Sequence, residues 1–160
     1  QLDAEGSIQY GMYYWDDNYP DSHVFAEGEC LRKTFDPDFM LYHTMAVDEW
    51  GHMKGADSAE YANAVAAVGH LIAARMPEWL EKGYQVVVTA DHGMNNLGIH
   101  VGTEHAQREV ALYIFSDKVE NGRFEENYIS QLNVAPLVCK LMGVPATEGM
   151  KQELEIQLHK

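Results

Sequence analysis

Residues 84–90, with the sequence YQVVVTA, constrain the fold most, because a short β-branched apolar run is typical of a buried strand. A second apolar run, EVALYIFS at residues 109–116, predicts another strand. Ahead of both, apolar residues recur at intervals of three and four over residues 57–75, which predicts an amphipathic helix. This alternation predicts an α/β fold, a layered sandwich with helices on a largely parallel sheet.

Two further elements extend this order. The run FMLYHTMAV, residues 39–47, predicts a third buried strand. Glycines then punctuate DEWGHMKGADS, residues 48–58, which predicts a loop. The stretch NYISQLNVAPLVCKLMGVP, residues 127–145, predicts a helix that is ended by Gly143 and Pro145.

Local signals also mark the ends of the helix predicted over residues 57–75. Asp57 and Glu60 have the spacing of a capping box at its start. Pro77 lies where the helix should stop or bend.

The stretch YGMYYWDDNYPDSH, residues 10–23, is aromatic and acidic without clean periodicity. We expect a loop with short extended pieces there. Its aromatic cluster has two interpretations, local packing or a lid on the substrate side of a site.

The charge of the chain limits its partners. The formal net charge of −14 argues against a nucleic-acid or anionic-membrane surface, since both reward patches of Lys and Arg. No apolar run approaches the roughly 20 residues that a transmembrane helix needs. The two cysteines, Cys30 and Cys139, lie far apart and leave the redox compartment and the localisation open.

Five chemically competent side chains follow two predicted strands. Asp48 and His52 lie four residues apart after the first, and the segment TADHGMNNLGIH places Asp91, His92 and His100 after the next. Ligands of α/β sheets bind beyond the carboxyl ends of strands. Carboxylate and imidazole groups suit zinc, manganese or iron, and a pair of cations can clamp a phosphoryl group. The alternative is a polar turn with incidental histidines.

Three stretches of the chain carry a family resemblance. VDEWGHMKGADSAEY, VVVTADHGMNNLGIHVGT and NVAPLVCKLMGVP, in this order, resemble characteristic stretches of the type I phosphodiesterase/nucleotide pyrophosphatase family, which belongs to the alkaline phosphatase superfamily. The resemblance runs from about Phe39 to about Pro145. It implies an alkaline-phosphatase-like fold that holds two divalent metal ions, zinc in the first place and manganese as the alternative.

The resemblance also implies roles for the five residues. Asp48 and His52 match two ligands of one metal, and a later His supplies the third. Asp91 and His92 match ligands of the second metal.

His100 and His105 compete for the third position on the first metal. Family members have a His followed by two small residues and Thr, and HVGT fits this pattern with His100 as the ligand. Val101 departs from the pattern, because it replaces a glycine.

The family's Thr or Ser nucleophile lies well upstream of the Asp-x-x-x-His loop, and Thr34, in RKTFDPDF, stands in the wrong setting for it. We therefore expect residues 1–160 to be a single partial catalytic domain that is inactive alone and lacks the N-terminal half of the same domain. Within it, 1–38 is a poorly readable segment, 39–145 the metal-site core and 146–160 a C-terminal tail.

The function implied for the intact parent is hydrolysis of phosphodiester or nucleotide pyrophosphate bonds in a small-molecule substrate. The alternatives are a phosphomonoesterase or phosphotransferase of the same superfamily, a non-catalytic metal-binding domain, or an α/β domain without a site. Among the other histidines, we expect His43 to be packed or to support a ligand, and His23, His70 and His159 to have no role.

Overall fold

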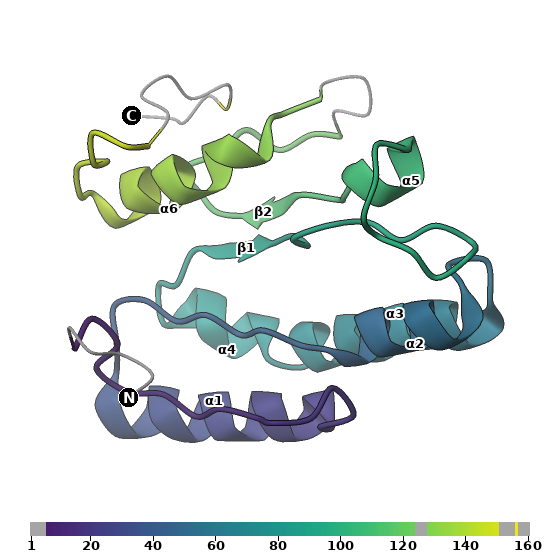
Figure 1. The fold of residues 1–160 in the computed structure, drawn as a ribbon. Coiled ribbons are helices and arrows are strands. Elements are labelled where there is room, and N and C mark those ends of the chain that lie inside the picture. Colours follow the sequence, from purple (N-terminus) through teal and green to yellow (C-terminus); the bar gives the residue numbers. More distant parts are fainter. Residues whose placement is uncertain (1–5, 124–127, 151–155, 157–160) are drawn as a thin grey trace. The chain divides into compact units, whose positions relative to one another are not determined.

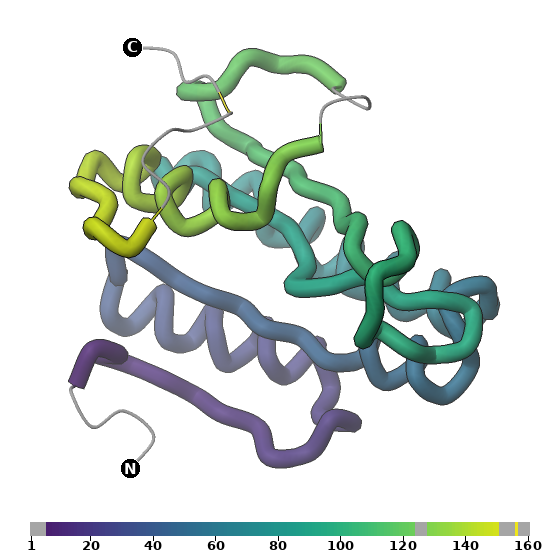
Figure 2. Tube along the Cα trace, turned by 45° about the horizontal axis from the view of Figure 1, so that its top comes forward, coloured from purple at the N-terminus to yellow at the C-terminus, as the bar shows by residue number. Residues whose placement is uncertain are grey.

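The structure is a computed structural model that describes residues 6–123, 128–150 and 156 (Figures 1 and 2). The chain divides into two compact units. One comprises Gln1–Met76 with Asp91–Val110, and the other Pro77–Ala90 with Ala111–Lys160. Across the described residues, no helix combines the length and the apolar character needed to cross a bilayer. Most of the expected tail, and His159 within it, lies outside these residues.

The first unit contains three main helices, α1 (Asp21–Phe35), α2 (Ala46–Lys54) and α3 (Ala59–Ala73). Helices α2 and α3 pack against each other, and α1 contacts α3 (Figure 1). The segment 91–110 belongs to the same unit and carries the short helix α5 (His105–Arg108).

The predicted N-terminal loop is correct as far as Pro20 and wrong from Asp21, where α1 begins. Helix α1 could not be predicted from a repeating apolar pattern, because this helix buries few apolar side chains. Tertiary contacts hold it instead: Phe25 stacks on Tyr42 with ring centroids 5.2 Å apart, and the Arg75 guanidinium lies 5.1 Å from the Phe25 ring centroid.

The loop predicted over residues 48–58 is wrong, because α2 occupies most of it. A glycine inside a helix costs about 1 kcal/mol relative to alanine, but Gly51 is buried in a close contact. A Cβ at Gly51 would lie 2.8 Å from Met94 Cε, so the glycine lets the segment carrying Met94 approach the helix. Packing thus overrides the local preference for a loop.

The strand predicted over residues 39–47 is also wrong. The chain is irregular up to Met45, and α2 begins at Ala46. Phe39 and Leu41 are 53% and 78% exposed, so the apolar run that predicted a buried strand is not buried. Instead, Asp21 Oδ1 accepts hydrogen bonds from the backbone N–H groups of Met45 (3.2 Å) and Ala46 (3.4 Å), which secures the start of α2.

Helix α3 confirms the amphipathic pattern, but its N-cap differs from the prediction. Ser58 rather than Asp57 is the N-cap, and its Oγ accepts a hydrogen bond from Tyr61 N at 3.1 Å. Pro77 lies in the first turn of the next helix, α4 (Met76–Glu81), where its missing N–H costs no hydrogen bond.

The second unit contains the predicted strands β1 (Val86–Val88) and β2 (Tyr113–Phe115). They pair antiparallel, with Val87 opposite Ile114. The largely parallel sheet is therefore not found among the residues that the structure describes. The only helix in the connection, α5, is four residues long, which does not supply the covering helix of a parallel crossover.

The C-terminal helix is confirmed over Val134–Met142 as α6, which is capped by Gly143 in the left-handed region. The N-terminal part of the prediction is wrong, because residues 128–130 form neither helix nor strand and Gln131–Asn133 form the 3₁₀ turn η1. Helix α6 lies along the β1–β2 pair within the same unit (Figure 1). The buried residues Leu137, Leu141 and Ile156 form the core there, packed against Val87 and Ile114, among others. The unit is thus a small helix-on-sheet layer.

The corrected N-cap of α3 gives a stability prediction. Ser58→Ala should lower the free energy of unfolding by about 0.5–2 kcal/mol, because Tyr61 N loses its hydrogen-bond acceptor. Asp57→Ala is the matched control and should change it by less than about 0.5 kcal/mol. Urea titration followed by circular dichroism measures both, and equal losses would contradict the assignment.

Candidate metal centre

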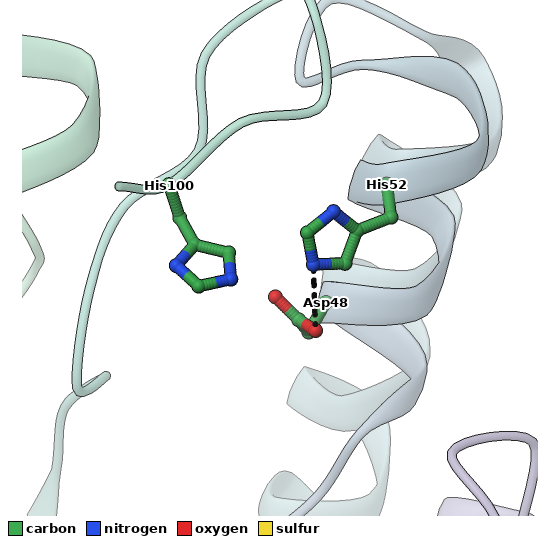
Figure 3. A group of neighbouring side chains, drawn as sticks. All are labelled: Asp48, His52 and His100. Carbon is green, nitrogen blue, oxygen red and sulfur yellow. Dashed lines mark ion pairs between the residues drawn. The ribbon is translucent and has the colours of Figure 1, made fainter. Parts of the chain in front are cut away.

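Three potential ligands gather on one side of α2. Asp48 and His52 lie one helical turn apart on this helix, and His100 comes from the segment 91–110 (Figure 3). One ligand atom from each of the three lies within 4.8 Å of the others. The four-residue spacing puts the first two on one face because the segment is a helix, which the sequence did not predict.

His52 is held with one ring nitrogen toward Asp48. Its Nε2 lies 3.4 Å from Asp48 Oδ2, the contact that is dashed in Figure 3. Its Nδ1 lies 2.8 Å from the carbonyl oxygen of Gly98. A carbonyl oxygen only accepts hydrogen bonds, so Nδ1 carries the proton and the neutral ring has its lone pair on Nε2. A backbone carbonyl thereby fixes the orientation of this candidate ligand.

Gly98 makes this contact possible. Its φ is +74°, and a Cβ there would lie 2.7 Å from His52 O and 2.9 Å from Gly51 O. Only glycine combines this backbone conformation with so close an approach to the end of α2. The sequence signal was the glycine of NNLGIH, but its carbonyl partner was not predictable.

Asp91 and His92 lie beside these three residues. His92 Nε2 lies 3.8 Å from Asp48 Oδ1 and 3.6 Å from Asp91 Oδ2. The rings of His92 and His100 stack with centroids 3.8 Å apart. His92 Nδ1 donates to the carbonyl oxygen of Gly93 at 3.0 Å. The structure therefore brings together all five residues that the sequence singled out.

The donor set fits a divalent cation. Asp48 Oδ1 is buried, and no hydrogen bond from any residue that the structure describes reaches it. Buried carboxylate oxygens in proteins normally have a partner, so this atom has unused capacity for one. One carboxylate and two imidazoles are also a ligand set that zinc uses.

The carboxylates give the site a negative field. Burial first, and then the Asp48 carboxylate, raise the pKa of Tyr61 above its usual value. Burial also raises the pKa of Tyr14, with further contributions from Asp17, Asp21 and Asp91. A bound cation would offset this field.

Sequence reasoning missed one pair of side chains. The Tyr14 hydroxyl and His43 Nδ1 are hydrogen-bonded at 2.6 Å, and the charge of Asp91 acts on Tyr14. His43 is thus engaged with the aromatic N-terminal stretch, and no spacing in the sequence links the two.

The competing His105 lies elsewhere. Its side chain is 91% exposed. His105 is the first residue of α5, and its Nδ1 pairs with the carboxylate of Glu109, the residue directly after this helix. Thr34 is exposed on α1.

The family model described as type I phosphodiesterase / nucleotide pyrophosphatase matches residues 12–134. These residues include the five candidate ligands and most of both units.

Among curated proteins, the chain is similar to GPI ethanolamine phosphate transferase 3, catalytic subunit, of Mus musculus, with 27% identity over 96% of this chain and 15% of that protein. It is 24% identical to GPI ethanolamine phosphate transferase 2 of Schizosaccharomyces pombe, over 70% of this chain and 17% of that protein. It is 31% identical to the 2,3-bisphosphoglycerate-independent phosphoglycerate mutase of Wolinella succinogenes, over 73% of this chain and 23% of that protein. The chain thus spans less than a quarter of each. No solved structure matches it.

The role of Gly98 gives a second prediction. Gly98→Ala should lower the free energy of unfolding by more than about 1 kcal/mol, because a Cβ conflicts with both the positive φ and the His52 carbonyl. The His52 side-chain NMR signals should also shift as the Gly98 carbonyl moves away.

Gly69→Ala is the control, since Gly69 lies within α3 with nothing within 4 Å of the added Cβ. It should raise stability by about 0.5–1 kcal/mol. A neutral Gly98→Ala would refute the close approach.

Proposed function

Because the chain belongs to the type I phosphodiesterase/nucleotide pyrophosphatase family of the alkaline phosphatase superfamily, we propose that its Asp and His cluster is part of a two-metal centre for phosphoryl transfer. The observation that carries this proposal is the convergence of ligand atoms of Asp48, His52 and His100 within 4.8 Å of one another, together with the unused capacity of the buried Asp48 Oδ1. The proposal includes the alkaline-phosphatase-like sheet of the parent, of which this chain would contribute part.

The ligands divide between the two cations as the family resemblance implies. Asp48, His52 and His100 would hold the first, with Asp91 and His92 contributing to the second. Zinc is the proposed metal and manganese the alternative, because both accept carboxylate and imidazole ligands.

The chain's own residues orient these ligands. The carbonyl oxygens of Gly98 and Gly93 each accept a hydrogen bond from the Nδ1 of a histidine, which directs Nε2 of His52 and His92 toward the carboxylates. A pair of cations at such a centre supplies charge neutralisation for the attacking and leaving oxygens of a phosphoryl group.

The relatives favour transfer over hydrolysis. Two of the relatives described above are named GPI ethanolamine phosphate transferases. Transfer of an ethanolamine phosphate group from a phosphodiester breaks the phosphoester bond to the donor alcohol and forms a new one to the acceptor hydroxyl. We therefore propose that the parent protein transfers ethanolamine phosphate to a GPI acceptor. Hydrolysis of phosphodiester or nucleotide pyrophosphate bonds is the second candidate, favoured by the family description.

The nucleophile is proposed to come from the parent protein outside this chain. Thr34 is the candidate weighed from the sequence, and it is an exposed residue of α1. The chain alone should therefore bind metal without turning over substrate. A non-catalytic metal-binding role for the parent would show the same binding, so activity must be tested on the parent.

Metal binding by this chain tests the ligand set. Calorimetric titration with zinc should show a saturable site, and His100→Ala should weaken it by at least about 100-fold, since losing a ligand exceeds the roughly 10–100-fold cost of losing a supporting partner. His105→Ala should leave the affinity unchanged, because that side chain points to solvent beside Glu109. If the two substitutions weakened zinc binding equally, His100 would not be a ligand of this site.

The parent protein tests the reaction. With a phosphodiester of ethanolamine and p-nitrophenol, the zinc-loaded parent should release p-nitrophenol, and a GPI acceptor should receive the ethanolamine phosphate group. The His52→Ala parent should do neither, because the substitution removes a proposed ligand. If p-nitrophenol is released at the same rate with and without the acceptor, and no ethanolamine phosphate reaches the acceptor, the parent is a hydrolase. If p-nitrophenol is released from p-nitrophenyl phosphate and not from the phosphodiester, the parent is a phosphomonoesterase.

A further inference from the structure

We propose that Gln107 is a positioning residue that sets His100 against His92 in the metal centre. The inference rests on the proposed function, since it takes His100 to be a metal ligand. It assigns a role to a side chain of α5 that contributes no ligand atom to the cluster.

The side chain of Gln107 holds the backbone on both sides of His100. It is 5% exposed, and its Nε2 donates to the carbonyl oxygens of Ile99 (3.2 Å) and Val101 (3.3 Å). These are the residues immediately before and after His100. The first bond fixes the peptide group that joins Ile99 to His100, and the second fixes the peptide group that follows Val101. Together they hold the short stretch of backbone from which the His100 imidazole projects.

The backbone of the same residue holds the other histidine segment. Gly93 N, directly after His92, donates to the carbonyl oxygen of Gln107 at 2.9 Å. The rings of His92 and His100 stack at 3.8 Å with an interplanar angle of 15°. Gln107 is therefore the common anchor of the two segments, and the stacked rings are the result of that shared attachment.

The amide of Gln107 is itself held in one orientation. Its Oε1 accepts from Glu104 N at 3.2 Å, within the capping box of α5, which leaves Nε2 to face the loop. Glu104 Oε2 in turn accepts from the buried Asn95 Nδ2 at 3.2 Å, and Asn95 Oδ1 accepts from Ile99 N at 2.9 Å. This closed set of bonds makes the loop conformation specific.

Two functions of the amide can be separated. Its oxygen caps α5, and its nitrogen holds the loop. Gln107→Glu keeps an acceptor for Glu104 N, but an ionised carboxylate cannot donate to the two carbonyls and is repelled by them. It therefore retains the capping bond and loses the loop contact. Gly102→Ala disturbs the amide without changing residue 107, because a Cβ at Gly102 would lie 2.3 Å from Gln107 Oε1 and 3.0 Å from Nε2. It displaces the whole amide, so it weakens the capping bond as well as the loop contact, and the φ of +156° adds backbone strain.

The experiment titrates zinc into the chain and records the visible spectrum of the cobalt(II) form, with Asn133→Ala as the control. Asn133 is a fully buried amide that donates to Ser130 O in the second unit. Gln107→Glu and Gly102→Ala should weaken zinc binding by about 10–100-fold and alter the cobalt bands, as loss of partners that orient ligating histidines does. Asn133→Ala should lose stability and keep both the affinity and the bands.

The outcomes distinguish this inference from the proposed function. A folded wild-type chain that binds no metal, or an affinity that survives His100→Ala, overturns the proposed centre and the role of Gln107 with it. If His100→Ala abolishes binding while Gln107→Glu keeps the wild-type affinity and cobalt spectrum, the centre stands and Gln107 has no positioning role. Should Gln107→Glu fail to fold by circular dichroism, Gly102→Ala decides by the same criteria.

Discussion

The close approach of the segment 91–110 to α2 is the contact on which the first unit and its cluster depend. Apart from α5 this segment has no helix or strand, so contacts must hold it. Ala56 N donates to Asn95 O at 3.1 Å, just after the end of α2, and Met94 is buried against Gly51. Without these contacts the segment would have no fixed position, and His100 would not meet Asp48.

Local patterns predicted the elements whose stability is local. The β-branched run gave β1, the three-and-four spacing gave α3, and Gly143 ended α6. Long-range packing decided the rest. Helix α2 forms around a glycine because Met94 packs there, and the antiparallel direction of β2 depends on the path of the connecting segment. Neither feature can be predicted from the residues of the element itself, because both depend on contacts with distant parts of the chain.

The same division holds for the candidate site. Residue types and the family resemblance singled out Asp48, His52 and His100, and the structure places them together. His52 is oriented by the backbone carbonyl of Gly98, and a backbone contact of this kind leaves no residue-type signal in the sequence. Gln107 is a common polar residue whose burial becomes visible only when the chain returns on itself. Supporting groups were therefore harder to predict than the groups they support.

The placement of two donors on one turn of α2 makes the cluster asymmetric in how it assembles. Asp48 and His52 lie on one face of a single helix and are neighbours whenever that helix is formed, whereas His100 reaches them only when the segment 91–110 folds against α2. The entropic cost of bringing the segment 91–110 to α2 therefore applies to His100 and not to the two residues on the helix. In the proposed centre, α2 would therefore supply two of the three ligands of the first cation from one preformed face, and His100 would complete the set.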